Sequence, residues 1–385
     1  MKVRTARGKQ RPLAILCLSM AGGGAELAVA RLANGLSARG HSIDLVLWRK
    51  TGPILDKVNS DVRVIALGGR RPFLLFRIAR YFLTERPRLV LSHQTFLNSL
   101  AALALQMTFN KAPLLATEHN AYTRAIATKR SWILGVYRLA PLLYRRCDIV
   151  AAVSSGVAQD AHKALKVPSA KLRVVYNPAV SPMVHEQAAT ASAPHPWLAD
   201  AQVPVFISVN RLVPQKNPQL LLRAFAQVRR HMPCRLIFLG AGQLETELEG
   251  QTQALGIAKD VYFAGFMPNP YAWIVRAHTL VLASDFEGFA IVVAEALALG
   301  TRVVSTDCEF GPAEILNDGE YGRLVAVGDE DALAAAMKAA LETHETGSQA
   351  DLRKSRGGVY NEIAYLDRYE AIMKMLLEGA ATSRS

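Results

Sequence analysis

Two carboxylates stand out as the residues of this sequence most able to do chemistry. Glu287 and Glu295 lie eight positions apart, and Glu295 sits among valine, alanine and leucine residues at positions 292–297. An unpaired charge in such surroundings costs several kcal/mol, so Glu295 needs a hydrogen-bond donor. Each glutamate taken alone is also explained by helix capping or by pairing with a neighbouring Lys or Arg, and only the surrounding arrangement favours a functional role.

A pair of cations is the second candidate. Arg211 and Lys216 lie five positions apart, between a predicted strand at residues 205–210 and a helix that begins near Pro218. From a strand-to-helix loop the two side chains can reach one anionic group from two sides, Arg as a planar fork and Lys as a point charge. Two solvated surface cations are the alternative.

The elements that position Glu287 follow from the apolar pattern around it. A buried parallel strand, a tight turn, a helix and a second strand are predicted at residues 279–283, 285–288, 289–299 and 302–305. Gly300 ends the helix. Such a turn directs backbone N–H groups and the positive end of the helix into the same space, so an anionic group binds there readily.

The two glutamates are followed by the stretch Gly-Pro-Ala-Glu-Ile at residues 311–315. Two glutamates separated by seven residues and followed by Gly-Pro-x-Glu-Ile resemble the signature of the retaining glycosyltransferases of the GT-B fold, specifically family 4. The resemblance covers essentially the whole chain, from the glycine-rich loop near Gly22 to the last predicted helix. It implies an α/β fold in which two Rossmann-like, doubly wound domains face each other across a cleft.

The resemblance implies roles for the candidate residues. Arg211 and Lys216 match positions that hold the diphosphate of a nucleotide-sugar, and Glu295 would hold the ribose hydroxyls. Glu287 would contact the donor sugar and is not assigned the role of a nucleophile. Catalysis would rest on stabilising the departing diphosphate. The backbone N–H groups expected to assist belong to Phe289, Ala290 and Ile291.

A histidine in the N-terminal half completes the expected catalytic set. His119 follows a predicted strand at residues 114–117, and ligands of parallel sheets bind beyond the carboxyl ends of the strands. By resemblance it approaches the donor sugar, although a single histidine is more often structural. The expected catalytic residues are His119, Arg211, Lys216 and Glu287.

Gly23 and Gly24 belong to a glycine-rich turn after an apolar run at residues 13–20. Basic residues before this run give it some likeness to a secretory signal, but eight apolar residues are at the short limit for one. The amphipathic pattern at residues 27–39 instead predicts strand, turn and helix. The resemblance implies that this loop faces a sugar phosphate, because glycines let a ligand approach the backbone closely. A plain connection is the alternative.

Strands and helices alternate along the chain, which predicts parallel sheets in doubly wound layers. Further strands are expected at residues 42–48, 63–67, 89–92, 149–153, 236–239 and 261–263. Residues 179–203 are rich in Ala, Pro, Ser and His, which is typical of a linker. The expected order is an acceptor-binding domain, a linker, a nucleotide-sugar-binding domain and a helix crossing back to the first domain, at residues 1–180, 181–203, 204–359 and 360–385.

Composition narrows the class of protein. A length of 385 residues with 51% hydrophobic residues suits a soluble α/β protein of two domains. Four cysteines without a CxxC pair favour reduced thiols in a cytoplasm over a disulfide framework or zinc ribbon. The only Asp-x-Asp motif, residues 329–331, precedes a helical run and is explained by capping, so no metal ion is expected. The nucleotide-sugar is a co-substrate, and no cofactor is expected.

The formal net charge of +13 indicates an anionic partner. Nucleic acid is not expected, because the sequence has no zinc finger, ribonucleoprotein motif or concentrated recognition helix. Residues 70–86 and 129–146 instead mix Arg and Lys with aromatic residues and Leu, the composition of a helix on an anionic bilayer. A buried helix with basic flanks is the alternative. No stretch reaches about 18 apolar residues, so any membrane contact would be peripheral, on the inner face of the plasma membrane.

The first of these two segments has a definite helical register. Its apolar stripe consists of positions 74, 75, 78, 81 and 82. Phe73 and Phe76 fall at or beyond the edge of this stripe, and most of the arginines lie off it. The apolar surface is therefore wider than one packed face requires.

These features together predict a hexosyltransferase. The resemblance implies that it moves a sugar from a nucleotide diphosphate donor, with a UDP-sugar favoured, to a hydroxyl of a lipid-linked or envelope-glycan acceptor, as in lipopolysaccharide and other polysaccharide biosynthesis. The expected reaction retains the anomeric configuration and needs no metal. The alternatives are an isomerase resembling UDP-N-acetylglucosamine 2-epimerase, which shares the fold but lacks this motif, and a non-catalytic nucleotide-sugar-binding protein.

Overall fold

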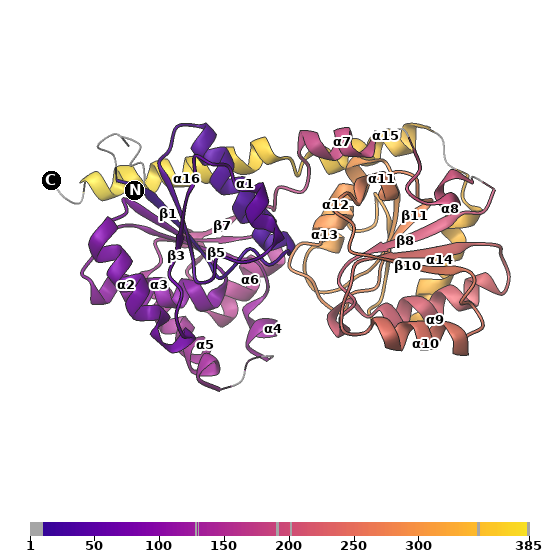
Figure 1. Cartoon of the computed structure of the whole chain (residues 1–385), viewed down its shortest axis with the longest axis horizontal. Coiled ribbons are helices and arrows are strands. Elements are labelled where there is room, and N and C mark those ends of the chain that lie inside the picture. Colours follow the sequence, from indigo (N-terminus) through magenta and orange to yellow (C-terminus); the bar gives the residue numbers. More distant parts are fainter. Residues whose placement is uncertain are drawn as a thin grey trace, which may run out of the picture. The chain divides into compact units, whose positions relative to one another are not determined.

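The computed structural model describes residues 11–127, 129, 131–189, 192–200, 202–344 and 347–382, and the chain divides into two units (Figure 1). Unit 1 contains Met1–Asn177 together with Ile363–Ser385, and unit 2 contains Pro178–Glu362. Each unit is a parallel sheet with helices on both faces. The predicted α/β class, with two doubly wound domains, is confirmed.

The sheet of unit 1 is parallel throughout, in the order β3-β2-β1-β4-β5-β6-β7. Strands β1 to β7 are Leu13–Cys17, Ile43–Leu47, Arg63–Ala66, Leu89–His93, Leu114–Glu118, Ile149–Ala152 and Leu172–Val174. The five strands β1, β2, β4, β5 and β6 are buried along their whole length, as expected of apolar strands covered on both faces. The strand order reverses between β1 and β4, and ligands of such sheets bind beside that point.

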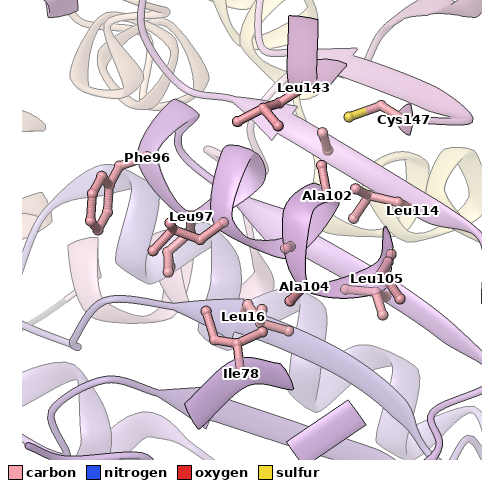
Figure 2. Close-up of a cluster of buried hydrophobic side chains, with 14 of the residues drawn as sticks. Leu16, Ile78, Phe96, Leu97, Ala102, Ala104, Leu105, Leu114, Leu143 and Cys147 are labelled. Carbon is pink, nitrogen blue, oxygen red and sulfur yellow. The ribbon is translucent and has the colours of Figure 1, made fainter. Parts of the chain in front are cut away.

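Helices α2, α3 and α5 pack on one face of this sheet, and α1 and α16 pack on the other. Helices α1 to α6 and α16 span Gly24–Ala38, Leu74–Glu85, Thr95–Met107, Tyr122–Ala127, Ser131–Leu143, Ser155–Ala164 and Glu362–Thr382. Figure 2 shows the core beside α3, with Leu16 of β1, Ile78 of α2 and Leu114 of β5 around the helix. Burial of these apolar stripes holds the carboxyl ends of β4 and β5 in place.

Unit 2 has a second parallel sheet, in the order β10-β9-β8-β11-β12-β13. Strands β8 to β13 are Val205–Val209, Arg235–Leu239, Val261–Gly265, Thr279–Leu282, Arg302–Thr306 and Arg323–Val325. Helices α9 (Pro218–Arg229), α10 (Glu245–Ala254) and α14 (Glu330–Glu342) cover one face. Helices α12 (Ile291–Ala298) and α15 (Gly347–Gly358) pack together on the other face (Figure 1).

The segment predicted as a linker, residues 181–203, carries α7 (Pro182–Ala188) and α8 (Pro196–Ala199) and belongs to unit 2. Both helices begin at a proline, whose fixed φ suits the first helical position, whereas in the sequence the same prolines indicate a loop. The last helix, α16, belongs to unit 1, where Tyr369 Oη and Thr117 Oγ1 share a hydrogen bond of 2.9 Å.

The predicted register of residues 70–86 is confirmed. Helix α2 buries Leu74, Ile78 and Phe82, whereas Phe73 and Phe76 are 55% and 60% exposed. In α5 the exposed large hydrophobic side chains among the described residues are Trp132, Leu139 and Leu142. Among the described residues, no helix combines the length and the apolar character needed to cross a bilayer. Five basic residues of the sequence patterns lie outside the described residues: Lys2, Arg4, Arg7, Lys9 and Arg130.

Candidate active site

The turn after β11 folds around Glu287. Ser284 Oγ donates a hydrogen bond of 2.8 Å to Glu287 Oε1, and Lys216 Nζ forms an ion pair with the same oxygen. The side chains of Lys216 and Glu287 are 16% and 8% exposed, so water reaches neither freely. Removing one member of such a pair leaves a buried charge without compensation.

The two loops that carry this ion pair are held against each other by hydrogen bonds. Gln215 Nε2 donates to Phe286 O, and Gln215 O accepts from the amide of Asp285, both at 2.9 Å. Asn217 Nδ2 donates to Asp285 Oδ1 at 2.8 Å. Asn217 also begins α9, because its Oδ1 accepts from the amide of Leu220. The backbone around the pair is therefore fixed from both sides.

The turn enters α12 through a strained residue. Ala290, directly before the helix, has a φ of 64°, in the left-handed region that residues other than glycine rarely adopt. The helix consequently begins at Ile291 rather than at the predicted residue 289. A Cβ at Gly311 would lie 2.5 Å from Phe289 O, so only glycine permits this close approach of two loops. The amide of Val293 donates to Ala290 O at 3.0 Å, whereas the amides of Ile291 and Val292, the first two of α12, have no acceptor inside the helix and, with the helix dipole, suit an anion.

Glu295 has the hydrogen-bond donor that its apolar surroundings require. This residue of α12 is 7% exposed, and its Oε1 accepts a bond of 3.1 Å from Tyr271 Oη. Tyr271 belongs to the short helix α11 (Tyr271–Ile274) and is equally buried. The predicted need for a donor is confirmed, but nothing in the sequence pattern identified Tyr271.

Arg211 has different surroundings from Lys216. It lies two residues after the end of β8 and is exposed, and within the described part of the chain its guanidinium has no carboxylate partner. Its loop is fixed, because the amide of Leu212 donates to Ala241 O at 3.1 Å. A Cβ at Gly240 would lie 1.9 Å from Asn210 O, so the neighbouring loop also requires glycine. Arg211 is thus an exposed cation on a rigid backbone.

His119 lies just beyond the carboxyl end of β5 and is 5% exposed. Its Nε2 is 2.9 Å from Nδ1 of His93, the last residue of β4. Burial lowers the pKa of His119 to about 4 and lowers the pKa of His93 well below its ordinary value, so both rings are neutral at pH 7. Sequence reasoning missed His93, because a single histidine at a strand end has no spacing signal.

A buried carboxylate, Glu118, is the neighbour of His119 in the sequence and the last residue of β5. Glu118 is 2% exposed and accepts hydrogen bonds from Thr95 Oγ1 at 2.7 Å and Asn98 Nδ2 at 2.8 Å, and another from Tyr144 Oη. Burial raises the pKa of Glu118 to about 7, although these donors favour its ionised form. This network anchors the start of α3 to β5.

The glycine-rich turn of unit 1 forms the entry to α1, which confirms the predicted strand, turn and helix. Gly23 precedes the helix and Gly24 is its first residue, and no side chain caps this end. Gly22 has a φ of 103°, which favours glycine. The first amides of α1 are therefore left to solvent or to a ligand.

The Asp-x-Asp motif caps a helix, as predicted. Asp329 Oδ1 accepts from the amide of Ala332 at 2.8 Å at the start of α14. Glu330 accepts from Arg223 Nε at 2.6 Å, and Asp331 accepts from Gln227 Nε2 at 3.0 Å. In the described residues, no group of three His, Cys, Asp or Glu side chains is placed to hold a metal ion.

Two family models match this chain, glycosyl transferases group 1 at residues 193–355 and glycosyltransferase family 4 at residues 22–179. A Campylobacter jejuni protein named N-acetylgalactosamine-N,N'-diacetylbacillosaminyl-diphospho-undecaprenol 4-alpha-N-acetylgalactosaminyltransferase is 28% identical, over 86% of this chain and 90% of its own length. A second protein of that organism, GalNAc-alpha-(1->4)-GalNAc-alpha-(1->3)-diNAcBac-PP-undecaprenol alpha-1,4-N-acetyl-D-galactosaminyltransferase, is 25% identical over 86% of this chain and 88% of its own. HepE from Anabaena, solved in complex with UDP, has a similar fold, with a TM-score of 0.77 and 19% identity over 94% of this chain and 100% of HepE.

Proposed function

Because this chain is a GT-B glycosyltransferase of group 1, we propose that it transfers a sugar from a nucleotide diphosphate donor to a hydroxyl of a lipid-linked glycan, with retention of the anomeric configuration. The observation that carries this proposal is the buried pair of Lys216 and Glu287 beside the first turn of α12. An ammonium group has three N–H donors, and one of them is directed to Glu287. The others are available to a diphosphate.

The leaving diphosphate would be stabilised from several directions. Lys216, the exposed Arg211 and the first amides of α12 would supply positive charge to the leaving diphosphate. Donors that are already in place before the substrate binds stabilise the charge of a transition state most effectively. This donor set makes a metal ion unnecessary in the proposed mechanism. Of the Glu287 oxygens, Oε1 accepts from both Lys216 and Ser284. Glu287 Oε2 would therefore bind a hydroxyl of the donor sugar.

Glu295 would bind the ribose of the donor. Tyr271 holds its Oε1, which orients the carboxylate, and a carboxylate accepts the two vicinal hydroxyls of a ribose well. In unit 1, His119 would contact a sugar hydroxyl, and the glycine-rich turn at Gly23 and Gly24 would lie against a phosphate or sugar.

We propose a UDP-N-acetylhexosamine as the donor and a polyprenyl-diphosphate-linked glycan as the acceptor. The support is that two relatives matching 86% of this chain are named as transferases of N-acetylgalactosamine to diphospho-undecaprenol-linked or PP-undecaprenol-linked glycans. Such an acceptor is anchored in a membrane. The exposed rings of Phe73 and Phe76, with the arginines beside them, support a peripheral contact with an anionic bilayer.

Thermal unfolding with a panel of UDP- and GDP-sugars tests the donor. A donor at 100 times its dissociation constant stabilises the native state by about 2.7 kcal/mol, which corresponds to roughly 5–10 °C for a unit of the size of unit 2. Release of nucleoside diphosphate, measured with and without a polyprenyl-diphosphate glycan, then tests the reaction. Acceptor-dependent release supports a transferase, isomerisation of the donor would indicate an epimerase, and stabilisation without either would indicate a binding protein.

A further inference from the structure

The histidine pair of unit 1 contains two buried nitrogen atoms without a partner. His93 Nδ1 and His119 Nε2 share a hydrogen bond of 2.9 Å, and the rings lie 5.2 Å apart, tilted by 31°. Within the described part of the chain, the outer nitrogens, Nε2 of His93 and Nδ1 of His119, form no hydrogen bond. His93 is 1% exposed and His119 is 5% exposed, so water does not substitute freely.

Two polar side chains near the rings are paired, whereas Ser92 Oγ, next to His93 in β4, is also buried without a hydrogen-bond partner in the described part of the chain. Thr117, opposite His93 in the strand register, is bonded to Tyr369, and Glu118 has its three donors. A buried polar atom left without a partner costs about 1–3 kcal/mol. Two such atoms on adjacent rings, at the carboxyl ends of neighbouring strands, are therefore more consistent with a site that a ligand completes than with core packing.

The hydrogen bond between the two rings couples the tautomer of one ring to that of the other. Both are neutral, so each carries one N–H, and only one hydrogen lies between them. If His93 donates from Nδ1, then His119 accepts at Nε2 and must carry its own hydrogen on Nδ1. If His119 donates from Nε2, then His93 must carry its hydrogen on Nε2. The two rings therefore always have the same tautomer, and one outer nitrogen donates while the other accepts.

We propose that His93 is a positioning residue for the glycosyl transfer: by its hydrogen bond it fixes the ring of His119 and sets the polarity of His119 Nδ1 toward a sugar hydroxyl. This inference rests on the proposed function for the identity of the ligand. The expected consequence is that a hydroxyl bound at His119 changes the tautomer of both rings together. His93 itself touches no reacting atom in this scheme.

Two substitutions separate positioning from packing. His93→Asn places an amide near the position of Nδ1 and keeps a hydrogen bond to His119, whereas His93→Phe keeps a ring and removes the bond. In His93→Phe the number of buried unpaired nitrogens is unchanged, because Nε2 of His119 replaces Nε2 of His93, so the melting temperature should stay near that of wild type. Its kcat should fall about 10–100-fold, as is typical when a supporting hydrogen bond is lost, with the donor KM changed little. His93→Asn should recover most of the lost kcat.

Nuclear magnetic resonance of the whole protein labelled with ¹⁵N-histidine gives the direct readout. The His93→Asn and His119→Asn spectra assign the two rings, and the wild type should show equal tautomer populations in both, which shift together when UDP-N-acetylgalactosamine is added. Unequal populations in the free protein, or wild-type kcat in His93→Phe, would overturn the inference even in an active enzyme. Absence of turnover by the wild type with every donor would instead remove the proposed function, while the tautomer measurement in the free protein would still decide the coupling.

Discussion

Replacement of Lys216 tests both the structure and the proposed chemistry of unit 2. Lys216→Ala leaves Glu287 buried with Ser284 as its remaining donor, and its side chain is only 8% exposed. Removing one member of a buried ion pair costs about 3–5 kcal/mol. At roughly 2–4 °C per kcal/mol for a unit of this size, the melting temperature should fall by roughly 6–20 °C. Turnover should fall by about two to three orders of magnitude, as when one donor to a developing anion is lost.

A double substitution separates these two effects. Lys216→Met together with Glu287→Gln removes both charges, keeps similar volumes and retains an acceptor for Ser284. Because no buried charge is left unpaired, the melting temperature should return to within a few degrees of wild type. Turnover should stay at or below that of Lys216→Ala, since neither the diphosphate contact nor the sugar contact is restored. Calorimetry and acceptor-dependent release of nucleoside diphosphate measure the two quantities. A double variant with near wild-type turnover would show that the pair is structural only.

Three further predictions concern the ribose, the membrane and pH. Glu295→Gln keeps the hydrogen bond from Tyr271 but loses the charge, so donor affinity measured by calorimetric titration should weaken by about 1.5–3 kcal/mol. If the wild type binds a 2′-deoxyribose donor as tightly as the normal donor, the proposed ribose contact is wrong. Substituting glutamines for the arginines beside the exposed rings of Phe73 and Phe76 should release the protein from anionic liposomes, because each arginine contributes about 1 kcal/mol to membrane binding. Donor binding should not weaken. Cosedimentation with liposomes that survives these changes and high salt would refute the proposed membrane contact. The residues to replace are Arg70, Arg71, Arg77 and Arg80. The pKa of Glu118 is raised from 4.5 to about 7, so its contribution to stability is present below pH 4.5 and is lost as pH rises through 7. The pKa of His119 is lowered to about 4, so its contribution to stability is present above pH 6.5 and is lost as pH falls through 4. Relative to wild type, Glu118→Gln should therefore lose less stability between pH 4.5 and 7, and parallel melting curves across this range would argue against a raised pKa.

The positions of most strands could be predicted because their signals are local, but β13 at Arg323–Val325, only three residues long, was missed. Strands β11 and β12 begin at Thr279 and Arg302, each one residue before an apolar run, since parallel strands buried on both faces are continuous apolar stretches. The predicted start of α12 was wrong because Ala290 adopts a left-handed conformation. Alanine rarely adopts this conformation, so the sequence gives no signal for it. That conformation is imposed by the loop around it.

The partners of the candidate residues could not be predicted. Lys216 is 71 positions from Glu287, and Tyr271 is 24 positions from Glu295. Elementary electrostatics states that a buried Glu295 needs a donor, but only the packing of α11 beside α12 says which one. His93 and His119 likewise meet because β4 and β5 are neighbours, a property of the strand order rather than of either residue.

Unit 1 is built from two separate stretches of chain, and unit 2 is an uninterrupted segment between them, Pro178–Glu362. In domain-exchange experiments, unit 2 is therefore a cassette, that is, an inserted segment joined to unit 1 at two junctions. A chimera fused only after Asn177 would lose α16 and would uncover the apolar surface against which Tyr369, Ile372 and Met373 pack. A chimera that exchanges the whole cassette leaves both cores complete, so the route to hybrid enzymes from this chain is insertion rather than end-to-end fusion.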